Sequence, residues 1–204
     1  MAIYNDQVLP RLINFACGER ALAPWRQKVC EGLTGAVVEI GFGSGHNVPF
    51  YPSDIDVVYA VEPSSLAMKL ATKRMASAFV SIQHVGLEGQ ALPLADASCD
   101  AALTTFTLCT VRDPEVALRE LWRVLKPGGQ LHFLEHGLAP GRALAFSQRL
   151  LDPLQHRIAG GCHLTREPLS MVTATGFELE WSQEGPGKGP KPWSYFSLGV
   201  AKKN

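Results

Sequence analysis

Short apolar runs alternate with helical patterns along most of this chain. An apolar run of about four to eight residues between turns has the length of a buried strand rather than of a helix. Strands that alternate with helices form a parallel sheet with helices on both faces. The pattern therefore predicts an α/β fold whose parallel strands are residues 35–40, 56–61, 81–85, 100–105 and 130–134.

One helix has clear boundaries in the sequence. Asp113 can accept backbone N–H bonds as its N-cap, and Pro114 suits the first turn, where an N–H would be unpaired anyway. Apolar side chains then recur at helical spacing, and the glycine pair within residues 126–129 ends the helix. Further helices are expected at residues 64–78, 138–160 and 165–176, the last capped by Thr165.

The two ends of the chain carry different patterns. Residues 177–181 and 194–200 read as strands around the turn-rich segment 185–192, which predicts a C-terminal hairpin with one antiparallel strand in the sheet. Residues 1–34 carry an apolar stripe at loosely helical spacing, interrupted by proline and glycine. We expect this segment to form a helical cover over the core, and a lid or a membrane-surface segment are the alternatives.

Composition excludes several classes of protein. The 204 residues fit one domain, and with 19 basic and 19 acidic residues the net charge of zero offers no electrostatic case for nucleic acid. The five cysteines include no CxxC pair, which argues against a disulfide framework and a closed zinc site. No apolar run reaches the roughly 20 residues of a membrane span, and the start of the chain lacks secretory features. We therefore expect a cytoplasmic protein.

A glycine-rich turn follows the first expected strand. Gly41, Gly43 and Gly45 let the backbone approach a ligand beyond the carboxyl end of that strand. A dinucleotide fingerprint would need a glycine at position 46, which is His46, so the turn is a poor pyrophosphate cradle. Glu62 ends the second strand, where a carboxylate accepts ribose hydroxyls and repels phosphate. Together these features predict an adenosine ligand without a phosphate at this point.

Two further carboxylates belong to the same region of the sheet. Glu39 lies inside the first apolar strand and needs a partner if it is buried. The ammonium group of the ligand, or water bound to it, is one candidate partner, and a backbone N–H or an arginine is the other. Glu88 follows the third strand and could accept from an adenine amino group, with Leu87 and Gly89 beside the ring.

Four successive motifs carry a resemblance to a known family. They are V-V-E-I-G-F-G-S-G, Y-A-V-E-P, E-G-Q-A-L-P-L-A-D-A-S-C-D and L-R-E-L-W-R-V-L-K-P-G-G, within residues 35–136. In this order they resemble class I S-adenosylmethionine-dependent methyltransferases, in the subgroup with the ubiquinone/menaquinone C-methyltransferases. The segments T-L-C-T-V, F-L-E-H-G and 151–167 are similar to the alkyl thiol methyltransferase-like proteins. This sequence departs from those proteins in having no hydrophobic N-terminal anchor, so we expect peripheral membrane contact at most.

The resemblance implies a fold, a cofactor and a set of binding residues. The fold is a Rossmann-like, doubly wound and mostly parallel seven-stranded sheet, its last strand antiparallel, in one domain spanning 1–204. Residues 138–165 would be a helical insertion near the methyl acceptor. The cofactor is S-adenosylmethionine, which becomes S-adenosylhomocysteine. The implied cofactor-binding residues are Glu39, Gly41, Phe42, Gly43, Ser44, Gly45, Asn47, Glu62, Pro63, Met68, Leu87, Glu88, Gly89, Thr105 and Phe106.

The acceptor side is expected beyond the fourth and fifth parallel strands. The candidate catalytic residues there are Thr107, Cys109 and His136, with Glu135 beside them. His136 is the candidate proton acceptor because its pKa range suits neutral pH, and a histidine held by a backbone carbonyl is the alternative. No metal site is expected: His156, Cys162 and His163 lack ligand spacing and are interpreted as parts of a satisfied turn. Arg166 is expected in solvent or paired with Glu167, or else on an acceptor anion.

These expectations favour a methyltransferase acting on a small-molecule or lipid-like acceptor, most simply an alkyl thiol or a similar soft nucleophile. A phospholipid amine N-methyltransferase and a quinone-type C-methyltransferase stay open as alternatives. A module that binds the cofactor without catalysis is a third, because no unambiguous base stands out. A nicotinamide-dependent oxidoreductase is disfavoured by His46.

Overall fold

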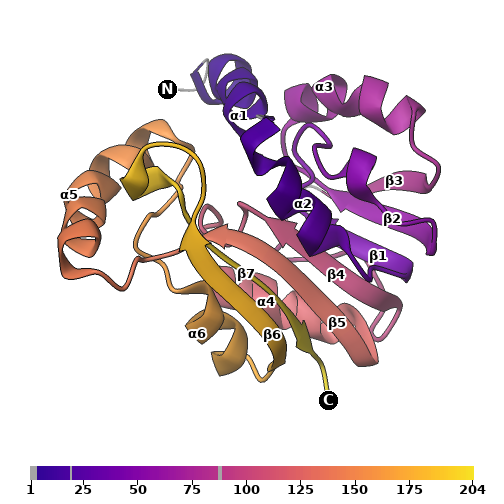
Figure 1. Cartoon of the computed structure of the whole chain (residues 1–204). Helices are drawn as coiled ribbons and strands as arrows, with labels where there is room; N and C mark the ends of the chain where they lie inside the picture. The colour runs from indigo at the N-terminus through magenta and orange to yellow at the C-terminus, as the bar shows by residue number, and fades with distance from the viewer. Residues whose placement is uncertain (1–3, 19, 87–88) are drawn as a thin grey trace.

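The strands form one sheet in the order β3-β2-β1-β4-β5-β7-β6, in a computed structural model that describes residues 4–18, 20–86 and 89–204 (Figure 1). Neighbours from β3 to β5 pair in parallel, and β7 is antiparallel to both β5 and β6. The predicted α/β, seven-stranded, mostly parallel sheet is confirmed. The strands are β1 Gly35–Ile40, β2 Ile55–Val61, β3 Ser81–Gly86, β4 Cys99–Thr105, β5 Leu125–His136, β6 Glu178–Pro186 and β7 Tyr195–Lys202.

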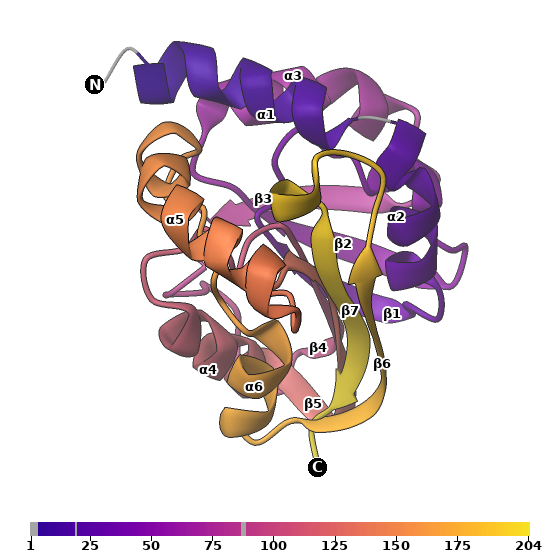
Figure 2. The same ribbon diagram turned by 60° about the vertical axis from the view of Figure 1, so that its left-hand side comes forward.

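Helices cover both faces of the sheet (Figures 1 and 2). They are α1 Leu9–Cys17, α2 Ala23–Cys30, α3 Ser65–Ala76, α4 Pro114–Val124, α5 Arg142–Ile158 and α6 Pro168–Ala174. Single turns of 3₁₀-helix lie at Arg20–Leu22, Val48–Phe50 and Lys191–Trp193, and a π-helical turn at Tyr4–Val8 leads into α1. Among the described residues, no helix combines the length and the apolar character that crossing a bilayer requires. The cytoplasmic location stays a prediction.

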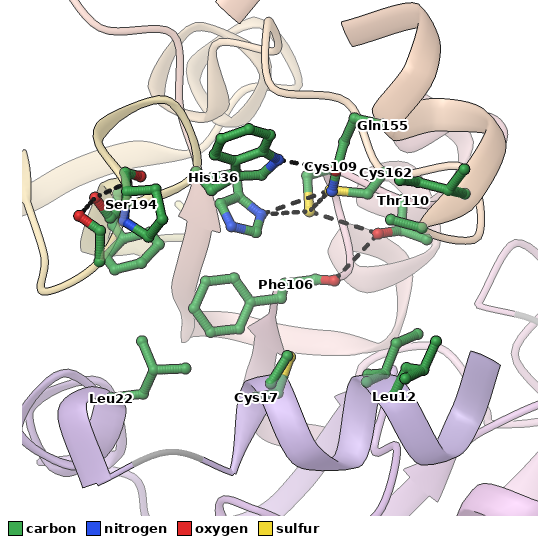
Figure 3. Close-up of a pocket in the computed structure, with 18 of the residues that line it drawn as sticks. Leu12, Cys17, Leu22, Phe106, Cys109, Thr110, His136, Gln155, Cys162 and Ser194 are labelled. Atoms are coloured by element: carbon green, nitrogen blue, oxygen red, sulfur yellow. Dashed lines mark hydrogen bonds between the residues drawn. The ribbon is translucent and has the colours of Figure 1, made fainter. Parts of the chain in front are cut away.

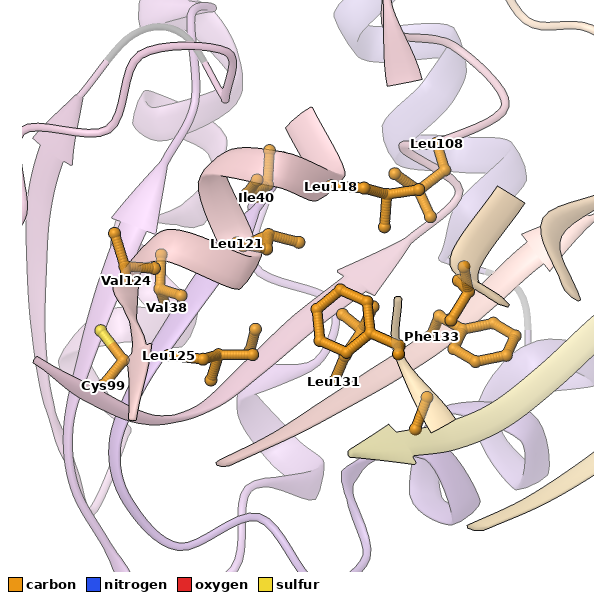
Figure 4. Close-up of a cluster of buried hydrophobic side chains, with 14 of the residues drawn as sticks. Val38, Ile40, Cys99, Leu108, Leu118, Leu121, Val124, Leu125, Leu131 and Phe133 are labelled. Atoms are coloured by element: carbon orange, nitrogen blue, oxygen red, sulfur yellow. The ribbon is translucent and has the colours of Figure 1, made fainter. Parts of the chain in front are cut away.

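The alternation of side chains along β1 divides the core between the two faces. Val38 packs with Leu121 of α4 in one buried cluster, which Figure 4 shows. Its neighbour Val37 points to the other face and packs with Val29 of α2. Side chains on a strand alternate between faces with a period of two, so consecutive valines serve opposite layers. This explains why the strand is apolar throughout and why both faces are covered.

Several boundaries differ from the sequence prediction. Asp113 is the N-cap of α4, as expected, and its side chain accepts from the Val116 N–H at 3.1 Å. Thr165 is not the cap of α6, because the helix begins at Pro168, whose fixed φ suits the first helical position. The segment 126–129 lies within β5, and β6 extends to Pro186, well into the expected loop. Both extensions follow from pairing with neighbouring strands, which local pattern does not encode.

Candidate active site

The turn after β1 requires glycine at its first position. Gly41, Gly43 and Gly45 have φ values of +73°, +57° and +74°, in the left-handed region that other residues rarely adopt. A Cβ atom on Gly41 would lie 1.9 Å from Oγ1 of Thr107. The Thr107 hydroxyl in turn donates to the Ile40 carbonyl at 3.1 Å. The turn is thus pressed against the loop that follows β4, and no side chain fits between them.

Glu62 ties this turn to the end of β2. One carboxylate oxygen accepts the Gly43 N–H at 2.8 Å, and the other accepts the Ser64 N–H at 2.8 Å. Burial raises the pKa of Glu62, and the backbone bonds from Ser64 and Gly43 oppose that rise without cancelling it. Each carboxylate oxygen has a second lone pair. The side chain can therefore hold the turn in place and still accept a hydroxyl of a ligand.

Glu39 has partners that the sequence prediction did not anticipate. Its side chain is 1% exposed and accepts from the Asn47 amide at 2.9 Å and from the Tyr51 hydroxyl. Arg26 reaches it only through Asn47, whose amide oxygen accepts from the guanidinium at 2.7 Å. The alternative of a backbone N–H or an arginine as the direct partner is wrong, because the Asn47 amide and the Tyr51 hydroxyl satisfy the carboxylate. A contact with the ammonium group of the ligand, or with water bound to it, stays a prediction. Burial raises the pKa of Glu39 to about 7, against the lowering effect of Tyr51, Asn47 and Arg26.

A cavity of about 580 Å³ opens beside the glycine turn, and we call it the turn cavity. Its volume lies within the range of small-molecule sites. Many of the predicted binding residues line it, and so does the catalytic candidate Thr107. The predicted cofactor residues in its wall are Gly41, Phe42, Gly43, Ser44, Glu62, Pro63, Gly89, Thr105 and Phe106.

Other predicted binding residues support this wall from behind or lie elsewhere. Glu39 and Asn47 belong to the buried network beneath it, and Gly45 lies in the turn without lining the cavity. Met68 of α3 packs against the hydrophobic cluster that contains Phe42 and Ala60, and it does not line the cavity. Leu87 and Glu88 lie outside the described residues, so their expected contacts with adenine stay predictions.

Arg26 is a cavity residue that the sequence analysis missed. It lines the turn cavity although it comes from the N-terminal segment, and it is 5% exposed. Its guanidinium donates to Asn47 and to the Cys17 carbonyl, and its Nε atom has no hydrogen-bond partner among the described residues. Nothing in the local sequence marks it, because only the packing of α2 against the strand ends brings it there.

A second cavity of about 490 Å³ lies between α1, α5 and the ends of β4 and β5, and we call it the apolar cavity (Figure 3). Its wall is mainly carbon, with Leu9, Leu12 and Leu22 on the N-terminal side. The two cavities share four lining residues, which are Ile13, Cys17, Phe106 and Thr110. Phe106 stands between them at φ +54°, so its backbone is held in a conformation uncommon for a bulky residue. A ligand in one cavity is thus adjacent to a ligand in the other.

Two of the catalytic candidates meet at the wall of the apolar cavity. The Nδ1 atom of His136 lies 3.6 Å from the sulfur of Cys109 and 3.6 Å from that of Cys162. Hydrogen bonding with Cys109 and with His136 lowers the pKa of Cys162 to about 4, against the effect of burial. Burial is the largest single effect on His136 and acts to lower its pKa, but the hydrogen bond with Cys162 and the negative charges of Cys162 and Glu135 together outweigh it, so the pKa is raised. The role of His136 as a proton acceptor stays a prediction. In this structure its Nδ1 atom faces two thiols.

Two of the three residues expected in a hydrogen-bonded turn after α5 have the local partners that this interpretation requires. His163 contacts the Asp152 carboxylate at 2.9 Å, and His156 contacts the Gly161 carbonyl at 3.1 Å. Cys162 instead turns inward to Cys109, with 3.7 Å between the sulfurs. Arg166 is not simply solvated, and among the described residues it makes no ion pair with Glu167: its guanidinium donates to the Leu108 carbonyl. The loop after α5 therefore contributes to the site more than its sequence indicated.

Comparisons with known proteins agree on one family. Residues 38–133 match the model of the methyltransferase domain family. The thiol S-methyltransferase TMT1B of Rattus norvegicus is 36% identical over 80% of this chain and 66% of the relative. The ubiquinone/menaquinone biosynthesis C-methyltransferase UbiE of Syntrophotalea carbinolica is 30% identical over 76% of this chain and 68% of the relative. This chain thus spans about two thirds of the length of both curated relatives.

A solved structure matches the whole described fold. It is a SAM-dependent methyltransferase from Thermotoga maritima, a possible histamine N-methyltransferase, with 27% identity and a TM-score of 0.71. The match covers 100% of this chain and 99% of that one. The shared architecture therefore includes the N-terminal helices and the C-terminal hairpin as well as the central sheet.

Proposed function

This chain belongs to the methyltransferase domain family and is an S-adenosylmethionine-dependent methyltransferase, and we propose that it methylates the sulfur of a small, hydrophobic thiol. The cofactor supplies an electrophilic methyl group on a sulfonium centre. The protein's own residues have to hold the two reactants in line and exclude water. The main observation in support of this proposal is the apolar cavity, which adjoins the turn cavity and shares four lining residues with it.

The residues of the turn cavity fit the cofactor. The turn at Gly41 and Gly43 is a cradle that a Cβ atom would fill or strain, and Glu62 beside it has lone pairs free for the ribose hydroxyls. The Nε atom of Arg26 is buried without a partner in the described part of the chain and suits the carboxylate of the methionine part. We propose these three roles, which give the cofactor one fixed orientation along the cavity.

The composition of the apolar cavity favours a soft, uncharged acceptor. Phe106, Phe196 and the leucines of the N-terminal segment offer no partner to a charged head group, although Lys188 also lines this cavity. A thiol with a pKa of about 8.5 is ionised to a few per cent at neutral pH, and the positive charge of the neighbouring cofactor increases that fraction. A thiol therefore becomes the nucleophilic thiolate without a strong protein base. This agrees with a site in which Nδ1 of His136 faces two cysteines.

The experiment is a methyl-transfer assay with labelled S-adenosylmethionine. The acceptor panel contains alkyl thiols of increasing chain length, a phosphatidylethanolamine and a reduced quinone. We expect labelled thioether from the thiols, with kcat/KM rising with chain length until the cavity is filled. Labelled lipid amine or quinone without any thioether would establish one of the alternative acceptors instead. A protein that binds the cofactor but labels nothing would be the non-catalytic module.

A matched pair of variants connects the assay to the cavity. Leu12→Trp fills the apolar cavity from α1, whereas Leu150→Trp places the same residue on the exposed side of α5. We expect the first variant to lose the longest thiols and to keep its affinity for the cofactor. The second should behave as the parent protein. If both variants methylate thiols of the same chain lengths equally well, the apolar cavity is not the acceptor site.

A further inference from the structure

Three metal-ligating side chains meet at the wall of the apolar cavity, where the sequence predicted none. They are Cys109 after β4, His136 at the end of β5 and Cys162 in the loop after α5, with their ligand atoms within 4.8 Å of one another. Figure 3 shows His136 pointing at both sulfurs. We propose that these three residues bind one zinc ion, whose fourth position faces the cavity and takes the sulfur of the acceptor thiol. The role of the fourth position rests on the proposed function.

The spacing of the three ligand atoms is that of a tetrahedral zinc site. Zinc lies about 2.3 Å from cysteine sulfur and about 2.0–2.1 Å from histidine nitrogen, so tetrahedral angles place two sulfurs about 3.8 Å apart and each sulfur about 3.6 Å from the nitrogen. The observed separations are 3.7 Å between the sulfurs and 3.6 Å from each sulfur to Nδ1 of His136. A zinc ion therefore enters with little movement of the side chains. A dithiol that is only hydrogen-bonded shares these distances, so the experiment has to separate the two.

The backbone around the three residues is held before any metal binds. The buried carboxylate of Glu135 accepts the Thr107 and Cys109 N–H groups at 3.1 and 3.2 Å. Asp152 on α5 holds the loop that follows Cys162 by accepting the Leu164 N–H at 2.6 Å.

The ring of His136 is held as well, because it packs against the rings of Phe106 and Phe196, with centroids 5.0 and 5.5 Å away. All three ligands are thus oriented by contacts other than those they make with one another.

The donor set selects the ion and leaves one position open. Two thiolates and an imidazole suit zinc, and three protein ligands with an open fourth position are the arrangement of catalytic zinc sites. All three residues line the apolar cavity, so a fourth ligand has to come from that side. Zinc with two cysteine thiolates and a neutral histidine carries no net charge. A bound acceptor thiolate makes the site anionic, which complements the positive sulfonium in the turn cavity.

The proposed step balances without an additional reactant. The acceptor thiol binds zinc through sulfur and releases its proton to solvent, because a thiol that coordinates zinc is deprotonated. A lone pair on this sulfur then forms the bond to the methyl carbon. The bond from that carbon to the cofactor sulfur breaks, and its electron pair stays on the cofactor sulfur. The products are a neutral thioether, which leaves the metal as a weaker ligand than thiolate, and S-adenosylhomocysteine.

Metal content tests the site without reference to activity. The full chain is reduced with a phosphine, stripped with a chelator and dialysed against Zn²⁺ alone, and bound zinc is measured by mass spectrometry. We expect one zinc per chain in the parent protein and in the control Cys30→Ala, whose cysteine is buried away from the cluster. Cys109→Ala, His136→Ala and Cys162→Ala should each lose more than about 100-fold in affinity, because loss of a ligand exceeds the 10–100-fold effect of losing a ligand's supporting partner.

Cobalt gives a second measurement that needs no variant. Co²⁺ added to the reduced parent should produce the intense visible bands of a tetrahedral site and a sulfur-to-cobalt charge-transfer band. Adding an alkyl thiol should shift these bands, since the thiol occupies the open position. Calorimetry with S-adenosylmethionine identifies any variant that has failed to fold. A parent protein that binds less than 0.1 zinc per chain at about 10 μM Zn²⁺, or gives an octahedral cobalt spectrum, overturns the proposal.

The two proposals fail in different ways. Zinc bound by all three residues together with no thioether product would leave the metal site standing and refute the thiol acceptor. Thioether formed at the parent rate by the chelated protein, and by a folded Cys162→Ala variant, would refute the metal site and leave the thiol acceptor standing. Loss of thioether in both, with recovery on adding Zn²⁺ to the chelated parent alone, is the result expected if both hold.

Discussion

Glu39 makes the stability of this protein depend on pH in a direction that can be worked out. The carboxyl is buried among Tyr51, Asn47 and Arg26, and its pKa is raised by burial from 4.5 to about 7. Between these two pH values the unfolded chain releases a proton that the folded protein keeps, so rising pH favours unfolding. The full difference is about 3 kcal/mol at 1.36 kcal/mol per pKa unit, and about 2 to 3 kcal/mol of it falls between pH 5 and pH 8.

Glu39→Gln removes this titration and keeps the shape of the side chain. The glutamine oxygen can accept from the Asn47 amide, and its NH₂ group can donate to the Tyr51 oxygen, because a hydroxyl also accepts. Relative to the parent, the variant should therefore gain about 2 to 3 kcal/mol of unfolding free energy on going from pH 5 to pH 8.

The assay is urea unfolding of both proteins at pH 5 and pH 8 without cofactor. Glu115→Gln serves as the matched control, because Glu115 is exposed on α4 and a surface change of this kind stays within about 0.5 kcal/mol. A Glu39→Gln advantage that is the same at both pH values would refute the reasoning. It would mean that the carboxyl ionises in the folded protein as readily as in water.

Three further predictions concern the turn, the cofactor and the core. Gly41→Ala should lower the unfolding free energy by about 2 to 5 kcal/mol, since it adds left-handed strain and a collision with Thr107. Gly185→Ala should be near neutral, because a Cβ there meets no atom of the described residues within 4 Å, and denaturant midpoints compare the two variants. Glu62→Ala should weaken S-adenosylmethionine by on the order of 100-fold in calorimetry, about 3 kcal/mol for two hydrogen bonds to a carboxylate, and an unchanged Kd would show that the ribose lies elsewhere. Leu121→Ala should cost about 2 to 5 kcal/mol in thermal or urea unfolding, and a loss below 1 kcal/mol would contradict its complete burial between α4 and the sheet.

Local sequence pattern predicts much of the fold, because the strands are short and a recognisable residue marks an end of nearly every helix. The Asp113-Pro114 start of α4 and the glycine turn after β1 are encoded within a few residues, and both form as predicted. Two boundaries that local pattern missed are set by pairing between strands, such as the extension of β6 to Pro186 along β7, and a third is the start of α6 at Pro168 instead of after Thr165.

The two halves of the candidate site differ in how far the sequence specified them. The turn cavity is built from the segments that follow neighbouring parallel strands, chiefly the glycine turn after β1, Glu62 after β2 and residues 105–112 after β4, so the predicted strand order brought much of its wall together. Arg26 was missed because its role depends on where α2 packs, and the partners of Glu39 were missed because Tyr51 and Asn47 come from the loop beyond the turn.

The sequence by itself determined the α/β order of elements, the glycine turn and the acidic end of β2. Each of these depends only on residues close together in the chain, through the periodicity of their side chains or the φ values that they can adopt. Only the tertiary structure decided that Cys109, His136 and Cys162 share one corner, since they come from three separate segments that the sheet order and the loop after α5 bring together. Spacing along a chain says nothing about distance across a sheet. The contacts of Glu135, Asp152 and Phe106 that hold these three ligands are likewise visible only once the chain is folded.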